Sequence, residues 1–200
     1  MNKVFATLHR FILDYRVAIN SMVVLGLFTQ DFLTGLSPIP FWDASQPLGL
    51  VALALVVVGM LVRSWAAGTL YKVKVLATNG PYSFTRHPLY LGSLLMSIGF
   101  VLILSDREDT IGLIVLALFL YYPKIRQEEG INQQVFGREW EAYKKRTMMF
   151  FPRSLSLNLK GGWSSAQWLR NREYRAFSLG LVFLGVLAWL ESHPLKGLLN

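Results

Sequence analysis

A short segment of the chain combines a turn motif with arginine, histidine and tyrosine. Residues 79–90 read Asn-Gly-Pro-Tyr-Ser-Phe-Thr-Arg-His-Pro-Leu-Tyr. The opening Asn-Gly-Pro predicts a turn, because glycine tolerates positive φ and proline presets its own φ. Pro88 favours an extended or turn conformation at His87 and can itself be the first residue of a helix. Arg86, His87 and Tyr90 are therefore expected to cluster at a helix N-terminus, whose free backbone N–H groups can receive acceptor atoms of a ligand.

An adjacent pair of glutamates, Glu128 and Glu129, lies about forty residues further along the chain. If the surrounding segment is a helix, one of the two carboxylates shares a face with apolar residues spaced by three and four. A carboxylate turned toward the protein needs a partner to offset its lost hydration. Lys124, Arg126, or a ligand with hydroxyls or positive charge could provide one. The predicted face comprises Ile125, Glu128 or Glu129, Asn132, Val135 or Phe136, Trp140 and Tyr143.

Each segment also has a plain structural interpretation. The first could be a loop beside a membrane, where arginine, histidine and tyrosine are common. The second could be an amphipathic interfacial helix with a solvated glutamate pair, its basic residues 144–146 touching anionic headgroups. A metal site is not expected, because the chain has no cysteine and its three histidines are scattered. Either segment alone leaves the choice open.

The composition indicates that lipid covers much of the molecule. Hydrophobic residues make up 53% of the 200-residue chain and charged residues 16%, against about 45–50% and about 25% in soluble domains. Apolar stretches at 48–62, extended as helix to Leu70 with Arg63 snorkelling, and at 89–104 and 111–122 predict helices, the last two joined by a polar turn at 105–110. Stretches at 17–36 and 176–190 complete the set. The expected fold is an all-α integral membrane protein with about five transmembrane helices, a short helical hairpin and a cytoplasmic cofactor site.

The basic charge follows this layout. The chain carries a formal net charge of +8 from 20 basic and 12 acidic residues. If the N-terminus is cytoplasmic, only Arg107 and Lys196 among the basic residues fall outside, as the positive-inside rule predicts. Nucleic acid is therefore not expected as a partner, whereas membrane lipids are. Segments 71–85 and 124–175 should form the cytoplasmic material that carries any chemistry.

The two motifs together resemble a known family. Residues 80–92, Gly-Pro-Tyr-Ser-Phe-Thr-Arg-His-Pro-Leu-Tyr-Leu-Gly, precede Glu128-Glu129, then Phe136-Gly137 and Tyr143-Lys-Lys-Arg146. In this order and spacing they resemble the isoprenylcysteine carboxyl methyltransferases, and the related membrane phospholipid methyltransferases share the pattern. The likeness covers roughly residues 70–153. A glutamine of the family's cofactor site has no clear match near Ala67.

The resemblance implies helices whose cytoplasmic ends enclose S-adenosylmethionine. It implies a lipophilic or lipid-linked acceptor, whether a carboxylate, an amine or a phospholipid headgroup, and a substrate-positioning arginine whose register favours Arg126 over Lys124. It leaves open which glutamate binds the ribose or amino-acid portion of the cofactor, with Glu128 preferred. The implied cofactor-binding residues are Lys74, Val75, Leu76, Ala77, Tyr82, Arg86, His87, Pro88, Leu89, Tyr90, Glu128 and Glu129.

Three regions follow: N-terminal transmembrane helices at 1–70, a methyltransferase core at 71–153, and a basic interfacial segment with a C-terminal hydrophobic helix at 154–200. A membrane reductase or a noncatalytic membrane scaffold on the same fold is the alternative. The polar residues lie in loops rather than at the span centres, which favours an enzyme over a transporter. The expected location is the cytoplasmic membrane of a bacterium.

Overall fold

The computed structural model describes residues 38–71, 74–104, 107–150 and 162–193, together with three isolated positions near the N-terminus. The predicted first span at 17–36 lies outside the described residues, apart from those isolated positions. So do residues 154–161 of the predicted interfacial segment and the tail after residue 193.

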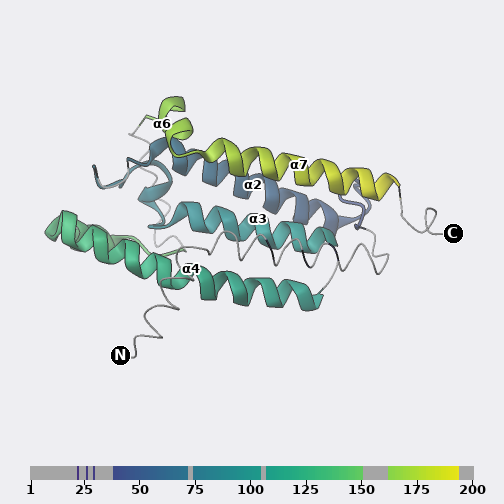
Figure 1. Cartoon of the computed structure of the whole chain (residues 1–200), viewed down its shortest axis with the longest axis horizontal. Helices are drawn as coiled ribbons and strands as arrows, with labels where there is room; N and C mark the ends of the chain where they lie inside the picture. The colour runs from purple at the N-terminus through teal and green to yellow at the C-terminus, as the bar shows by residue number, and fades with distance from the viewer. Residues whose placement is uncertain are drawn as a thin grey trace.

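The described part is helical, which agrees with the predicted fold class (Figure 1). The only β-type pairing in the described part is a parallel bridge between Thr85 and Met148. The elements are α2 (Pro47–Thr69), the short 3-10 helix η1 (Gly80–Ser83), α3 (Pro88–Leu104), α4 (Arg107–Phe136), α5 (Arg138–Arg146), α6 (Ser165–Arg170) and α7 (Glu173–Ser192).

The long helices lie side by side in the order α7, α2, α3 and α4 (Figure 1). Successive long helices alternate in direction, so the end of α2, the start of α3, the second half of α4 and the start of α7 meet at one end of the bundle. Short helices α5 and α6 lie at this same end. Because of this alternation, the polar segments that the sequence analysis identified as candidates for chemistry lie at the same end.

Small residues let α2 and α3 approach closely. A Cβ on Gly92 would lie 2.7 Å from the carbonyl oxygen of Gly59, and one on Gly99 would lie 2.6 Å from that of Ala52. Helices in a membrane pack in this way, because lipid supplies no hydrophobic driving force between them and small residues let their backbones come close. Helix α7 closes the other side of α2 through a core that includes Met60, and Gly180 contacts the same methionine.

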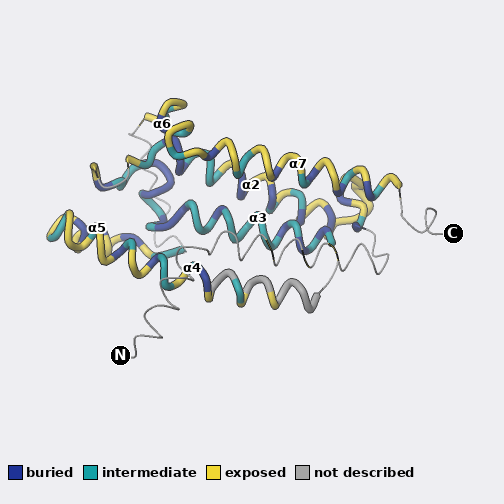
Figure 2. The backbone as a smooth tube through the Cα atoms, in the orientation of Figure 1, coloured by how far each residue is buried: buried dark blue, intermediate teal, exposed yellow. Residues whose placement is uncertain are grey.

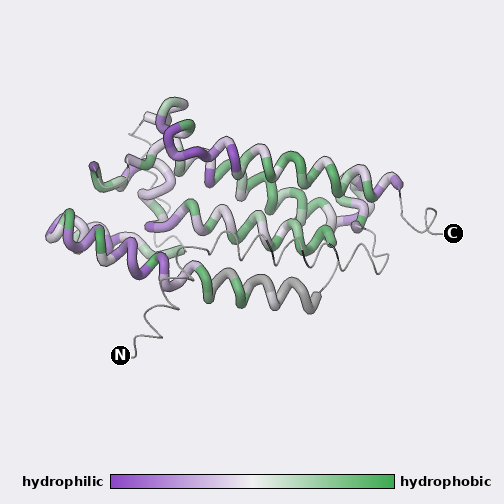
Figure 3. The backbone as a smooth tube through the Cα atoms, in the orientation of Figure 1, coloured by the Kyte–Doolittle hydropathy of each residue, from purple (hydrophilic) through white to green (hydrophobic). Residues whose placement is uncertain are grey.

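Helices α2 and α7 are long and apolar enough to cross a bilayer, and α3 is a shorter apolar helix of 17 residues. The predicted helices at 48–62, 89–104 and 176–190 are therefore confirmed. Large apolar side chains on the outer faces are exposed, among them Leu61 at 60% and Leu179 at 67%. Figure 2 shows these faces as exposed, and Figure 3 shows the same stretches as hydrophobic. A bilayer would cover such surface.

The predicted polar turn at 105–110 is wrong in extent. Helix α4 begins at Arg107, so four of those six residues are helical. The helix also continues across Pro123 to Phe136, and Figure 1 shows it changing direction part-way along. A proline inside a helix removes one backbone hydrogen bond and bends the helix, which here does not end.

Candidate functional site

The predicted turn at 79–81 is confirmed as the start of η1. Gly80 has a φ of 57°, a conformation that side chains other than glycine rarely adopt. The Tyr82 N–H donates to the carbonyl of Asn79 at 3.1 Å. The Tyr143 hydroxyl, from α5, donates to the Tyr82 carbonyl at 2.7 Å. The turn is thus tied to α5 as well as to itself.

Helix α3 begins at Pro88, as predicted. The residues just before it are held by the strand-like segment that follows α5. The Arg86 N–H donates to the Met148 carbonyl at 3.0 Å, and the Thr85 hydroxyl donates to the Met149 carbonyl at 2.6 Å. This link holds the residues just before α3, and it therefore also fixes the directions of the His87 and Tyr90 side chains.

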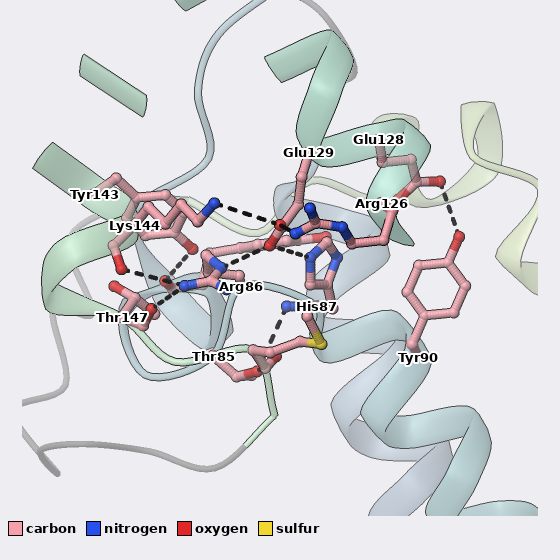
Figure 4. Close-up of polar contacts among 12 residues, drawn as sticks. Thr85, Arg86, His87, Tyr90, Arg126, Glu128, Glu129, Tyr143, Lys144 and Thr147 are labelled. Carbon is pink, nitrogen blue, oxygen red and sulfur yellow. Dashed lines mark hydrogen bonds and ion pairs between the residues drawn. The ribbon is translucent and has the colours of Figure 1, made fainter. Parts of the chain in front are cut away.

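Glu129 is the centre of an ionic cluster (Figure 4). Its side chain is 5% exposed, and its Oε1 atom lies 3.0 Å from Nε of Arg86 and 3.4 Å from Nε2 of His87. The Oε2 atom lies 3.6 Å from Nη1 of Arg126 and 3.9 Å from Nζ of Lys144. These separations give Oε2 charge neighbours but no hydrogen-bond donor among the described residues.

The surroundings of Glu129 keep it ionised. Burial raises the pKa of the carboxyl group, but the hydrogen bond from His87 and the charges of Arg86, His87 and Lys144 outweigh burial and lower the pKa below its ordinary value. A carboxylate can only accept, so Nε2 of His87 must carry the proton of that hydrogen bond. The cluster therefore combines a buried anion with several fixed donors.

Arg86 is committed to internal contacts. Besides Glu129, its Nη1 donates to the Lys144 carbonyl at 3.2 Å and to the Thr147 carbonyl at 2.5 Å. One guanidinium thus joins the start of α3, the second half of α4 and the end of α5. Arginine suits this role because its planar group carries five donors in fixed directions.

Glu128 points to the other side of α4, where its Oε1 accepts from the Tyr90 hydroxyl at 2.9 Å (Figure 4). Glu128 is half-buried, whereas Glu129 is buried. The centroid of the Tyr90 ring lies 5.3 Å from that of Tyr121, so an aromatic ring packs beside the tyrosine that donates to Glu128. The sequence left open which glutamate faces inward, and the structure places Glu129 there.

The remaining predicted residues fall into two groups. Lys74 and Val75 are exposed, while Leu76 is buried against Trp140 and Tyr143 of α5. The others lie around the start of α3, with Tyr82 and Pro88 buried and Ala77 and Leu89 half-buried.

The two candidate substrate cations differ in their contacts. The side chain of Arg126 is 57% exposed at the edge of the Glu129 cluster, whereas Lys124 bonds to Gln127 at 2.7 Å. Of the two, only Arg126 contacts the paired glutamates in the described part.

One feature of this end of the bundle was missed from the sequence. Arg63 does not snorkel: its Nε and Nη2 donate to Glu173 of α7 at 2.8 and 2.9 Å. The expected snorkelling of Arg63 is replaced by an ion pair, because a carboxylate from another helix lies within reach of the guanidinium. The signal available in the sequence was one charge, Arg63, inside the apolar stretch that forms α2.

The arrangement is suited to bind a ligand that carries positive charge and hydroxyls. Two carboxylates from one helix face donors from the first turn of another, at the polar end of an apolar bundle (Figure 3). A buried carboxylate oxygen without a donor is an acceptor that a ligand can use. Among the described residues no group of three metal-ligating side chains occurs.

Comparison with known proteins matches residues 50–133 to the isoprenylcysteine carboxyl methyltransferase (ICMT) family. The cobalt-zinc-cadmium resistance protein CzcN of Cupriavidus metallidurans is 35% identical over 74% of this chain and 66% of its own length. The nickel-cobalt-cadmium resistance protein NccN of Alcaligenes xylosoxydans xylosoxydans is 34% identical over 73% of this chain and 68% of its own. A probable protein-S-isoprenylcysteine O-methyltransferase of Oryza sativa subsp. japonica is 27% identical over 56% and 63%.

The chain thus spans about two thirds of the length of these curated relatives. No solved structure matches it. The family match contains the start of α3 and both glutamates, and it ends before α5 and α7.

Proposed function

The chain belongs to the isoprenylcysteine carboxyl methyltransferase family, and we propose that it transfers a methyl group from S-adenosylmethionine to a lipophilic or lipid-linked acceptor at a membrane surface. The observation that carries the proposal is the meeting of two motifs. His87, just before α3, and Tyr90, in its first turn, contact the adjacent glutamates of α4 although about forty residues separate the two motifs. Family membership alone supports the activity, and this geometry supports the site.

The residues present fit the proposed cofactor. S-adenosylmethionine offers a sulfonium, an ammonium and two ribose hydroxyls, all of which favour carboxylate neighbours. Glu129 has a buried Oε2 atom with no hydrogen-bond donor in the described part, and Glu128 is half-buried beside it. When bound, the cofactor would supply an electrophilic methyl group on positively charged sulfur.

We assign the binding roles as follows. Glu128 would accept from ribose hydroxyls or the ammonium, with Tyr90 orienting its carboxylate through their 2.9 Å hydrogen bond. Residues 74–77 would line the adenosine through backbone groups. Arg86 and Glu129 would contribute through the ion pair that holds the wall together. Tyr82, His87, Pro88 and Leu89 would form the rest of that wall.

The acceptor class follows from the surroundings of the site. The relatives named protein-S-isoprenylcysteine O-methyltransferases act, by their names, on a lipid-modified cysteine. Here too the polar end of the bundle adjoins exposed apolar helix faces, so a greasy acceptor could reach the site from the bilayer. A carboxylate, an uncharged amine or a phospholipid headgroup fits equally. Arg126, exposed beside Glu129, is the residue we assign to an anionic part of that acceptor.

The residues around the site would act by placement. A carboxylate or uncharged amine attacks a sulfonium methyl without a strong base, so no general base is required. In-line orientation and exclusion of water can supply the rate enhancement. The fixed start of α3 and the rigid Arg86–Glu129 pair provide such orientation.

The wider organisation is part of the proposal. We place about five helices across the bilayer, with the N-terminus and the site on the cytoplasmic face of a bacterial membrane. Residues 1–70 would form N-terminal transmembrane helices, 71–153 the methyltransferase core, and 154–200 an interfacial segment with the last span. The two candidate spans in the described part and the polarity of the site end support a spanning bundle with the site at one membrane face.

The test is calorimetric titration of the detergent-purified protein with S-adenosylmethionine and S-adenosylhomocysteine. The wild type should bind both, and Glu128→Gln and His87→Ala should weaken binding at least about tenfold, since hydrogen bonds to charged groups contribute about 1.5–3 kcal/mol. Glu139→Gln, at an exposed position of α5, is the matched control and should bind as the wild type does. If a folded wild type binds neither compound, the methyltransferase proposal fails, and a nicotinamide titration then tests a reductase.

A further inference from the structure

An ion pair outside the family-matched region reaches the same end of the bundle. Glu173, the first residue of α7, accepts from Arg63 of α2 through both oxygens, at 2.8 and 2.9 Å. The two side chains are 20% and 7% exposed. A bidentate pair of this kind fixes the orientation of the guanidinium as well as its charge.

The same guanidinium contacts the first turns of α3. Its Nη1 donates to the Leu89 carbonyl at 3.4 Å and to the Ser93 hydroxyl. The Ser93 hydroxyl in turn donates to the Leu89 carbonyl at 2.9 Å. Gly92 makes room for this contact, because a Cβ there would lie 2.5 Å from Cγ of Arg63.

Leu89 lies between the two site residues at the start of α3, His87 and Tyr90. The His87 side chain, two positions earlier, reaches Glu129, and the Tyr90 hydroxyl, one position later, reaches Glu128. A displacement of the Leu89 carbonyl would therefore move both contacts together. The geometry points to Glu173 as a positioning residue of the candidate site: through Arg63 it fixes the first turns of α3.

The start of α7 is itself held against α2. Asn171 donates to the carbonyls of Ala67 and Leu70 at 2.7 and 2.9 Å. The indole of Trp168 donates to the Ser64 hydroxyl at 2.8 Å. The two Asn171 bonds satisfy carbonyls at the end of α2, which a helix otherwise leaves without partners. Glu173 is thus presented from a rigid support.

The electrostatic surroundings agree with this connection. Burial raises the pKa of Tyr82, and the charges of Glu128 and Glu173 are among those that raise it further. Tyr82 therefore lies in the field of a site glutamate and of the α7 carboxylate together. The C-terminal helix is a structural part of the site end, although it lies beyond the family match.

The test uses three full-length variants in detergent. Glu173→Gln removes the charge from one partner. A double variant, Arg63→Met with Glu173→Met, removes both charges and the donors to α3, and leaves no unpaired buried charge. Glu191→Gln, the same substitution type at the far end of α7, is the control. Each is measured by thermal unfolding, by hydrogen exchange of amides in residues 88–93, and by titration with S-adenosylhomocysteine.

If Glu173 positions the site, the double variant should show faster exchange in residues 88–93 and at least a tenfold rise in the dissociation constant for S-adenosylhomocysteine. Its melting temperature should stay near that of the wild type. The control should change neither quantity. Wild-type exchange and affinity in a folded double variant overturn the proposal, as does unchanged affinity alone.

The effect on binding rests on the proposed function, whereas the effect on exchange does not. If the wild type binds no S-adenosylhomocysteine, the proposed function fails, and exchange alone then decides whether Glu173 holds the start of α3.

Discussion

Glu129 keeps its charge where little water reaches it. Its carboxylate is 5% exposed and is surrounded by Arg86, His87, Arg126 and Lys144. The hydrogen bond from His87 and the charges of Arg86, His87 and Lys144 lower its pKa against the effect of burial. Removal of one partner from the buried Arg86–Glu129 pair leaves the other uncompensated, which costs about 3–5 kcal/mol for a buried pair.

This carboxyl group predicts a pH dependence of stability. Because the folded pKa lies below the ordinary value of 4.5, the unfolded chain binds more protons near that pH. The stabilisation by Glu129 is complete above pH 4.5 and is lost as the pH falls through the lowered pKa. The melting temperature of Glu129→Gln should lie well below that of the wild type at pH 7, and the difference should shrink below pH 4.5. Glu139→Gln supplies the baseline, and a gap that stays constant into acid contradicts the assignment.

Helix α4 carries both glutamates beyond an internal proline. Pro123 removes the hydrogen bond that its nitrogen would donate to the Phe119 carbonyl and bends the helix before Glu128 and Glu129. Where this bend falls sets which part of α4 faces the start of α3.

Pro123→Ala should therefore act in opposite directions on stability and binding. Alanine is about 3 kcal/mol more favourable than proline inside a helix, so the melting temperature should rise. A straighter α4 should carry the glutamates away from His87 and Tyr90, and affinity for S-adenosylhomocysteine should fall at least about tenfold. Retained affinity with raised stability would show that the bend does not position the site.

Two glycines near the end of α4 should respond differently to alanine. Gly137, between α4 and α5, has a φ of 48°, whereas Gly130 lies inside α4, and a Cβ on either would meet nothing within 4 Å. Gly130→Ala should stabilise by about 0.5–1 kcal/mol through helix propensity alone. Gly137→Ala should destabilise by about 1–3 kcal/mol because of backbone strain. Denaturant unfolding of both variants compares them, and equal effects would argue against the turn at Gly137.

At the scale of the molecule, alternating helix directions separate two ends. The end with the candidate site is polar, and the helix faces between the ends are apolar and exposed (Figure 3). Asp43 precedes α2, and the start of α2 lies at the opposite end of the bundle from α5, which begins at Arg138 (Figure 2). A membrane that covers the apolar faces would place these residues on different sides.

Single-cysteine labelling tests this arrangement directly, because the chain has no cysteine of its own. In intact bacterial cells, Asp43→Cys should react with a membrane-impermeant maleimide, and Arg138→Cys should react only after the membrane is opened. The reverse pattern would invert the orientation, and reaction of both in intact cells would contradict a spanning bundle.

The sequence by itself determined the features that depend on neighbouring residues. Apolar length set the extents of α2, α3 and α7, since burial in lipid is decided by composition over a local stretch. The turn at Gly80 and the start of α3 at Pro88 followed from the restricted φ of glycine-proline and proline segments. The motifs also led to the family, although about five spans, the cytoplasmic face and the cofactor contacts remain predictions.

Only the tertiary structure decided which glutamate is buried. Adjacent helical residues point about 100° apart, and the inward direction depends on where Arg86 and α5 lie. The Arg63–Glu173 pair joins residues 110 positions apart, and no periodicity within either helix indicates it. Local patterns fix backbone conformation, whereas the partner of a buried charge is fixed by which helices pack together, and that choice is made by the whole chain.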